Sequence, residues 1–129
     1  MTACKTLPEF DSSNLKSVLQ AFAKAPLITL GQSWLPHPEP DFLSAEVRVG
    51  RVADQLLVLA TIPDVDIFTR VTEPNQRTWE LGDVFEIFLK PESESHYREL
   101  HVTPTNTRTQ FSFSAVGAPF EILPDGIFE

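Results

Sequence analysis

The chain has almost no cysteine: Cys4 is alone among 129 residues. No disulfide can therefore form within the chain, and zinc or redox sites built from paired cysteines are excluded. Long apolar runs are also missing, because no window approaches the roughly 18 apolar residues of a membrane span. The first residues lack the basic start and apolar stretch of a signal peptide. This predicts a cytoplasmic protein, or an extracellular one if a signal was removed from a longer precursor.

Basic residues are scarce as well. Ten Lys and Arg stand against 18 Asp and Glu, which gives a formal net charge of -8. Nucleic acids and anionic membranes both require clustered cations, so neither is predicted as the main partner. With only five glycines, the chain has no glycine-rich phosphate-binding loop, and it contains no nucleophile-elbow motif.

The chain nevertheless contains enough apolar residues for a core. Hydrophobic residues make up 42% of it and charged residues 22%, which is typical of globular proteins. A chain of this length buries about two-thirds of its unfolded surface. We predict one domain that spans residues 1–129.

One short amphipathic helix is predicted near the N-terminus. The apolar residues at helical spacing are Leu15, Val18, Leu19 and Phe22. A polar residue in the segment 11–13 is predicted to cap this helix, and Pro26 ends it.

Beyond Pro26 the apolar period falls to two, which is typical of strands. The predicted strands cover residues 26–31, 45–52, 56–62, 83–90, 96–103 and 108–115, with one more edge segment in 117–129. The strands 45–52 and 56–62 form a hairpin, and the second is predicted to be covered on both faces because it is apolar throughout. The last three form a meander. The fold class is therefore all-β: an antiparallel β-sandwich, immunoglobulin-like or jelly-roll-like, with one short N-terminal helix.

The meander carries polar residues where a structural strand needs none. Strand alternation and an assumed register predict one polar face, made of Glu86, Tyr97, Glu99, His101 and Gln110. Phe111 and Phe113 are predicted on the opposite face. Two interpretations stay open: a solvated face with cross-strand pairs, or a binding face. Glu86 favours the second, since its apolar neighbours on that face make an unpartnered carboxylate costly.

Trp79 precedes the meander and also has two interpretations. A single Trp is more often a core residue than a binding platform, and the same holds for Trp34. An exposed indole, however, matches the C–H face of a sugar ring, while neighbouring carboxylate, amide and imidazole groups can bond its hydroxyls. The residues around Trp79 supply this mixture.

The order of these residues resembles a known family. Trp79 is followed by the strand Gly82-Asp83-Val84-Phe85-Glu86-Ile87-Phe88 and then by Tyr97-Arg98-Glu99-Leu100-His101-Val102-Thr103-Pro104. This pattern is similar to family 9 carbohydrate-binding modules and the wider DOMON-like β-sandwiches. The resemblance implies that Trp79 stacks on a sugar, that Glu86 bonds its hydroxyls, and that Glu99 and His101 make further polar contacts.

The chain departs from that family in one respect. Such modules usually continue with further strands that include a second aromatic, whereas no Trp follows Trp79 here. The chain is then a shortened member, a fragment, or a protein whose sheet is completed by another copy. Because open sheet edges favour association, we expect a homo-oligomer with a saccharide as ligand.

Other functions are less well supported by the residues. Heme binding, known among DOMON-like proteins, lacks ligands, since the only methionine is Met1 and no motif joins two of the three histidines. Those histidines have no zinc spacing, and Asp64 with Asp66 falls short of a calcium loop. No cofactor or metal is therefore predicted. Glycoside hydrolysis by Glu86 and Glu99 remains an alternative, as does an interaction module without a sugar site, but the prediction is non-catalytic carbohydrate binding.

Overall fold

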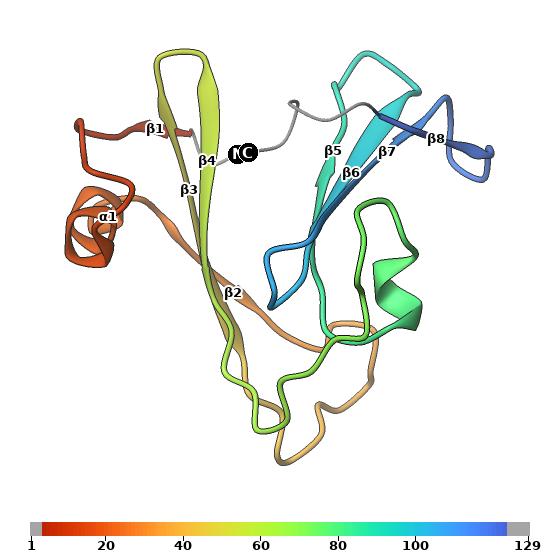
Figure 1. Ribbon diagram of the computed structural model, residues 1–129. Helices are drawn as coiled ribbons and strands as arrows, with labels where there is room; N and C mark the ends of the chain where they lie inside the picture. Colours follow the sequence, from red (N-terminus) through yellow and green to blue (C-terminus); the bar gives the residue numbers. More distant parts are fainter. Residues whose placement is uncertain (1–3, 124–129) are drawn as a thin grey trace. The chain divides into compact units, whose positions relative to one another are not determined.

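The computed structural model describes residues 4–123, and the chain divides into two compact units, Met1–Val65 and Asp66–Glu129. Each unit contains a four-stranded sheet, as Figure 1 shows. The elements in chain order are β1 (Lys5–Thr6), α1 (Leu15–Phe22), β2 (Leu27–Leu30), β3 (Ala45–Val52), β4 (Gln55–Thr61), the 3-10 helix η1 (Thr78–Glu80), β5 (Phe85–Leu89), β6 (Tyr97–Val102), β7 (Arg108–Phe113) and β8 (Phe120–Ile122). The predicted all-β class with one short N-terminal helix is confirmed. That the chain forms one domain stays a prediction.

The sheet of the first unit is organised around β3. Strand β4 pairs antiparallel with β3 from Glu46 to Val52, so β2 and β1 share its other edge, β2 antiparallel and β1 parallel. The predicted hairpin is confirmed, with Val52 opposite Gln55 and a tight turn in which Ala53 has a φ of 50°. The two-residue strand β1 was not predicted, because a strand so short has no periodicity to detect.

Strand β4 is less covered than its apolar sequence predicts. Leu56 is 48% exposed, and the side chains from Leu57 to Ala60 are only partly buried. The expectation of cover on both faces is therefore wrong for this strand. An apolar run alone does not distinguish a strand with two packed neighbours from a strand that leaves part of its surface open.

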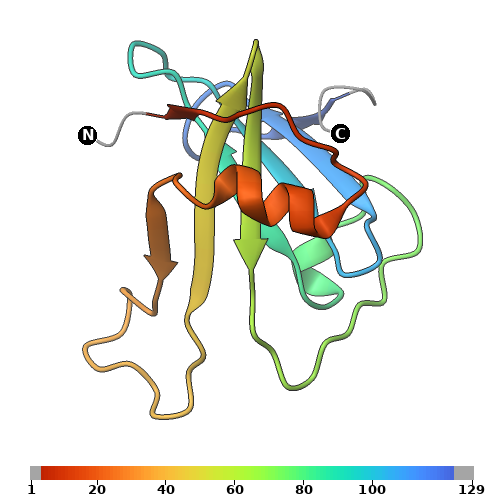
Figure 2. The ribbon, with the colours of Figure 1, turned by 90° about the vertical axis from the view of Figure 1, so that its left-hand side faces the viewer.

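Helix α1 lies across one face of the first unit's sheet (Figure 2). Its apolar side packs in a buried cluster of Leu7, Ala21, Phe22 and Ala25. The N-cap is Asn14, whose side-chain oxygen accepts from the backbone N–H groups of Lys16 and Ser17. The predicted cap in 11–13 is wrong because the Asp11 carboxylate already accepts from Ser13, which closes a turn before the helix.

The sheet of the second unit is a simple antiparallel meander in the order β5-β6-β7-β8. All three predicted meander strands are present, and β8 is the additional edge segment expected in the tail. The register of the meander places His101 on β6 opposite Glu86 on β5 and Thr109 on β7. These side chains therefore share one face of the sheet.

Gln110 lies on the other face, so its predicted place in the polar row is wrong. It is paired with Leu100, while Phe111 is opposite Glu99 and Phe113 is opposite Tyr97. The two phenylalanines therefore join the carboxylates on one face instead of lying opposite them. The loop 103–107 sets this register by joining Val102 to Arg108, and a change of one residue in its length would exchange the faces of β7.

The segment that precedes β5 closes on itself and carries η1. Arg70 N donates to Leu81 O at 2.8 Å, and Asp83 N donates to Phe68 O at 2.9 Å. Gly82 lies between Leu81 and Asp83, the residues that make these two hydrogen bonds, and its φ is 142°. A Cβ at this position would meet the Phe68 carbonyl oxygen at 2.7 Å. Glycine is therefore required at this position. The closed segment fixes the residues of η1 in place.

Candidate functional site

One face of the second unit's sheet forms an open depression of about 500 Å³. It is lined by Arg77, Trp79, Glu86, Glu99, His101, Phe113 and Phe120. The depression thus combines two carboxylates with aromatic rings. All of these residues belong to one unit, and they come from η1 or the residue before it, from the three meander strands and from β8.

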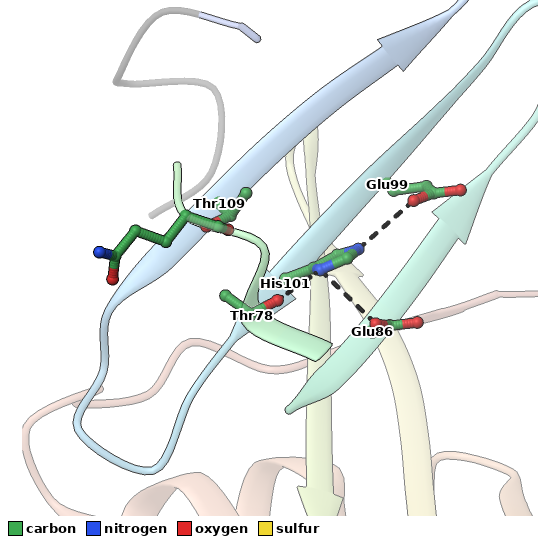
Figure 3. A network of polar contacts seen from close by, with 6 residues as sticks. Thr78, Glu86, Glu99, His101 and Thr109 are labelled. Carbon is green, nitrogen blue, oxygen red and sulfur yellow. Dashed lines mark hydrogen bonds and ion pairs between the residues drawn. The ribbon is translucent and has the colours of Figure 1, made fainter. Parts of the chain in front are cut away.

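His101 is the centre of the polar contacts at this site, as Figure 3 shows. Its Nδ1 lies 2.8 Å from Thr78 Oγ1 and 3.6 Å from Glu86 Oε1. Its Nε2 lies 3.5 Å from Glu99 Oε2. The imidazole therefore contacts η1 and two carboxylates, one from its own strand β6 and one from the neighbouring strand β5.

Burial keeps this imidazole neutral. The His101 side chain is 1% exposed, and desolvation lowers its pKa from 6.5 to about 4. A neutral ring has one N–H donor and one acceptor. If Nδ1 accepts from the Thr78 hydroxyl, the Nε2–H group points toward Glu99, whose carboxylate can only accept. This tautomer suits Thr78 and Glu99, although Nε2 makes no hydrogen bond within residues 4–123.

Both carboxylates are partly withdrawn from water. The side chain of Glu86 is 29% exposed and that of Glu99 is 14% exposed. Desolvation raises the pKa of Glu86, and repulsion from Glu99 raises it further. Desolvation also raises the pKa of Glu99, while a hydrogen bond from the Tyr97 hydroxyl opposes that rise. A ligand that donates to these oxygens would offset part of this desolvation cost.

The indole of Trp79 forms one wall of the depression. Its ring lies edge-on to His101 at 5.6 Å and to Phe111 at 5.8 Å between ring centroids. Trp79 is 44% exposed, whereas Phe111 is 1% exposed. The indole is therefore anchored on a buried ring and still offers accessible apolar surface.

The structure brings together four of the residues proposed from the sequence: Trp79, Glu86, Glu99 and His101. Tyr97 is next to them rather than among the lining residues, and its ring stacks on Phe113 at 4.6 Å with an interplanar angle of 4°. Gln110 lies on the opposite face, as described above. Whether any of these residues binds a ligand stays a prediction.

Several residues of the site were missed by the sequence analysis. Arg77, Phe113 and Phe120 line the depression, and the fully buried Thr78 supports His101. Of these, Phe113 alone lies in a strand for which alternation predicts a face, and the predicted face is wrong. A signal for Thr78 was its position beside Trp79, but no strand or helix period extends through that segment.

Within residues 4–123, no group of three or more His, Cys, Asp or Glu side chains is arranged to hold a metal ion. The same described range contains no helix of the length and apolarity needed to cross a membrane. Comparisons of the chain with protein families, curated proteins and solved structures found no match. The resemblance to family 9 carbohydrate-binding modules therefore rests on the motif residues given above.

Proposed function

We propose that the depression binds a saccharide without catalysing its hydrolysis. The observation that supports this most directly is the half-exposed indole of Trp79 beside the carboxylates of Glu86 and Glu99. A sugar ring has an apolar C–H face, which packs on an aromatic ring, and hydroxyl groups that donate to carboxylates. Both kinds of partner line one depression.

Binding accounts for the site better than hydrolysis does. A glycosidase requires one carboxyl group that gives a proton and a second that attacks or activates water, on either side of the scissile bond. Here the buried His101 ring lies within 3.6 Å of one carboxylate and 3.5 Å of the other. The depression is also open, so it would exclude water poorly from a reacting bond.

The test is calorimetric titration of the protein with neutral, cationic and anionic mono- and oligosaccharides, using Trp79→Ala and a matched control. Trp79→Ala is expected to abolish binding, while Trp79→Phe should retain part of it. Trp34→Ala removes an indole that is 72% exposed and does not line the depression, so it should leave binding unchanged. Circular dichroism would check that each variant is folded. Failure of every saccharide to bind the wild type would contradict the proposal.

A second candidate function, an interaction module that associates with another copy, is favoured by strand β2. Leu27 and Ile28 are each 46% exposed and Leu30 is 41% exposed, so one short strand presents three large apolar side chains. Such surface favours association. Light scattering of the wild type and Ile28→Lys would test this: a dimer that dissociates in the variant supports it, and a monomeric wild type contradicts it.

A further inference from the structure

The charges around the depression differ from what a neutral sugar requires. Among the described lining residues, Glu86 and Glu99 are carboxylates and Arg77 is the cation. The Arg77 guanidinium already donates to Glu80 Oε1 at 3.1 Å, and both of those side chains are more than half exposed. The positive charge is thus paired at the rim, whereas the two carboxylates are nearer the buried face.

Burial has a further effect on these two groups. Because they are partly desolvated, their mutual repulsion is screened less than it would be at the surface. The neutral imidazole between them supplies no positive charge to reduce this repulsion. A ligand hydroxyl can donate a hydrogen bond here, but only a cation also compensates the charge.

His101 provides a separate indication that a polar group is missing from this site. Its side chain is 1% exposed, and its Nε2 makes no hydrogen bond within the described part of the chain, since Glu99 Oε2 at 3.5 Å is too distant or poorly directed for one. Buried polar atoms are normally hydrogen-bonded. A ligand that draws Glu99 into a defined position would let the carboxylate accept from this nitrogen at the same time.

The aromatic walls suit the same kind of ligand. Trp79, Phe113 and Phe120 all line the depression that holds the carboxylates. Aromatic faces attract cations and also pack on the C–H groups of a sugar ring. An anionic sugar, by contrast, would be repelled by both carboxylates.

We infer that the saccharide bound in this depression is an amino sugar whose protonated amine is held between Glu86 and Glu99. This inference rests on the proposed saccharide binding and specifies the class of sugar. The ammonium donates to the two carboxylates, and the apolar face of the ring packs against Trp79.

The experiment compares a glucosamine tetramer with its fully N-acetylated form, because the two share one backbone and differ in charge. At about pH 6 the amines are largely protonated, and a bound ammonium favours the ionised form of Glu86 and Glu99, which offsets the rise that burial causes in the pKa of each carboxyl group. We expect the glucosamine tetramer to bind about tenfold more tightly, as a charge-assisted hydrogen bond would give. Added salt should reduce this preference.

Two variants that each lose one negative charge test which carboxylate causes the preference for the amine. Glu99→Gln should remove the preference for the amine, whereas Glu121→Gln should keep it, because Glu121 is paired with Ser112 and so lies on the opposite face of the sheet. Tighter or equal binding of the N-acetylated tetramer would overturn the inference but leave saccharide binding intact. Binding of neither tetramer, nor of a neutral glucose oligomer, would overturn both proposals. Equally tight binding of spermidine, an amine without a sugar, would overturn the assignment to a saccharide.

Discussion

The two units have sheets of equal strand number but bury different chemistry. In the first, the packed cluster that includes Phe22 of α1 is apolar, and Gln32, at 9% exposure, is the one buried polar side chain among the described residues of this unit. In the second, His101, Thr78 and Thr109 are as deeply buried as Phe111. The first unit shows that an apolar cluster is sufficient to pack a sheet of this size. The polar groups of the second unit therefore add a desolvation cost that folding alone does not require.

Their surfaces differ in the same way. The first unit has a depression of about 320 Å³ lined by Leu19, Ala23, Glu46, Arg48, Leu59 and Thr61. It contains one carboxylate, one guanidinium and no aromatic ring. The depression of the second unit has two carboxylates, one guanidinium and several aromatic rings. The aromatic rings and the excess of carboxylates therefore lie in the unit that also buries more polar side chains. This combination is expected if the depression is a binding site.

The largest effect is expected when one buried ring is removed from each unit. Phe111→Ala and Phe22→Ala are each expected to lower the free energy of unfolding by about 3–5 kcal/mol, because both rings are almost fully buried. Only Phe111→Ala should also abolish saccharide binding, since Phe111 supports Trp79. Urea denaturation and calorimetric titration, at a temperature where both variants are folded, measure the two effects. Equal loss of binding in Phe22→Ala would show that binding merely follows stability.

A smaller loss of stability is expected when the buried pair of His101 and Thr78 is broken. His101→Leu leaves the buried Thr78 hydroxyl without its 2.8 Å partner, which should lower the free energy of unfolding by about 1–3 kcal/mol. Adding Thr78→Val removes the unpaired hydroxyl, so the double variant should recover most of that loss. Urea denaturation of the wild type, the two single variants and the double variant forms a complete cycle. Losses that simply add would mean that the two side chains do not depend on each other.

The two units should also differ in their response to pH, because only the second has a buried histidine among the described residues. The pKa of His101 is about 4 in the folded protein and near 6.5 when unfolded, so the unfolded chain binds more protons between these values. Stability is therefore expected to fall as the pH drops from about 6.5 toward 4. Glu86 and Glu99, whose pKa values are raised, contribute the opposite slope and reduce the net effect.

Denaturation at a series of pH values tests this in His101→Gln, which should lose the downward slope. His96→Gln is the control, because the His96 side chain is 45% exposed and lies 2.6 Å from Glu94, away from the buried contacts of His101. An unchanged slope in His101→Gln would assign the pH dependence to other groups.

The smallest loss of stability is expected for a substitution in the first unit. Asn14→Ala removes the side chain that caps α1 and should lower the free energy of unfolding by about 1 kcal/mol. The Lys16 and Ser17 N–H groups would then have to be satisfied by water. Asn14→Ser, which keeps a capping oxygen, should lose much less, and binding should be unchanged in both. A loss as large in Asn14→Ser would argue against capping as the cause.

Sequence patterns were sufficient for most elements of the fold. The alternation in 45–52 and in the three meander strands is a direct consequence of burial on a pleated sheet, so these strands were recognised within a few residues. The helix was recognised because its apolar residues repeat at 3.6. Patterns of this kind do not fix the pairing between strands, and the register of β7 was therefore assigned wrongly, with Gln110 and Phe111 exchanged.

The candidate site was predictable only in part, for a related reason. Glu86, Glu99 and His101 were grouped correctly because they lie on two strands whose alternation agreed with the final register. Thr78 depends on hydrogen bonds that close the segment between Phe68 and Asp83. Such contacts join residues far apart in the chain and follow no period, so they become visible only in three dimensions.

The contact between the Trp79 and His101 rings, 5.6 Å between centroids, gives this protein an internal optical reporter. A protonated imidazole quenches indole fluorescence much more strongly than a neutral one. The second indole, Trp34, can be removed by Trp34→Phe, which leaves Trp79 as the sole indole of the chain. Its emission intensity would then report the protonation of His101, and its emission wavelength would report any molecule that covers the depression, with no added label.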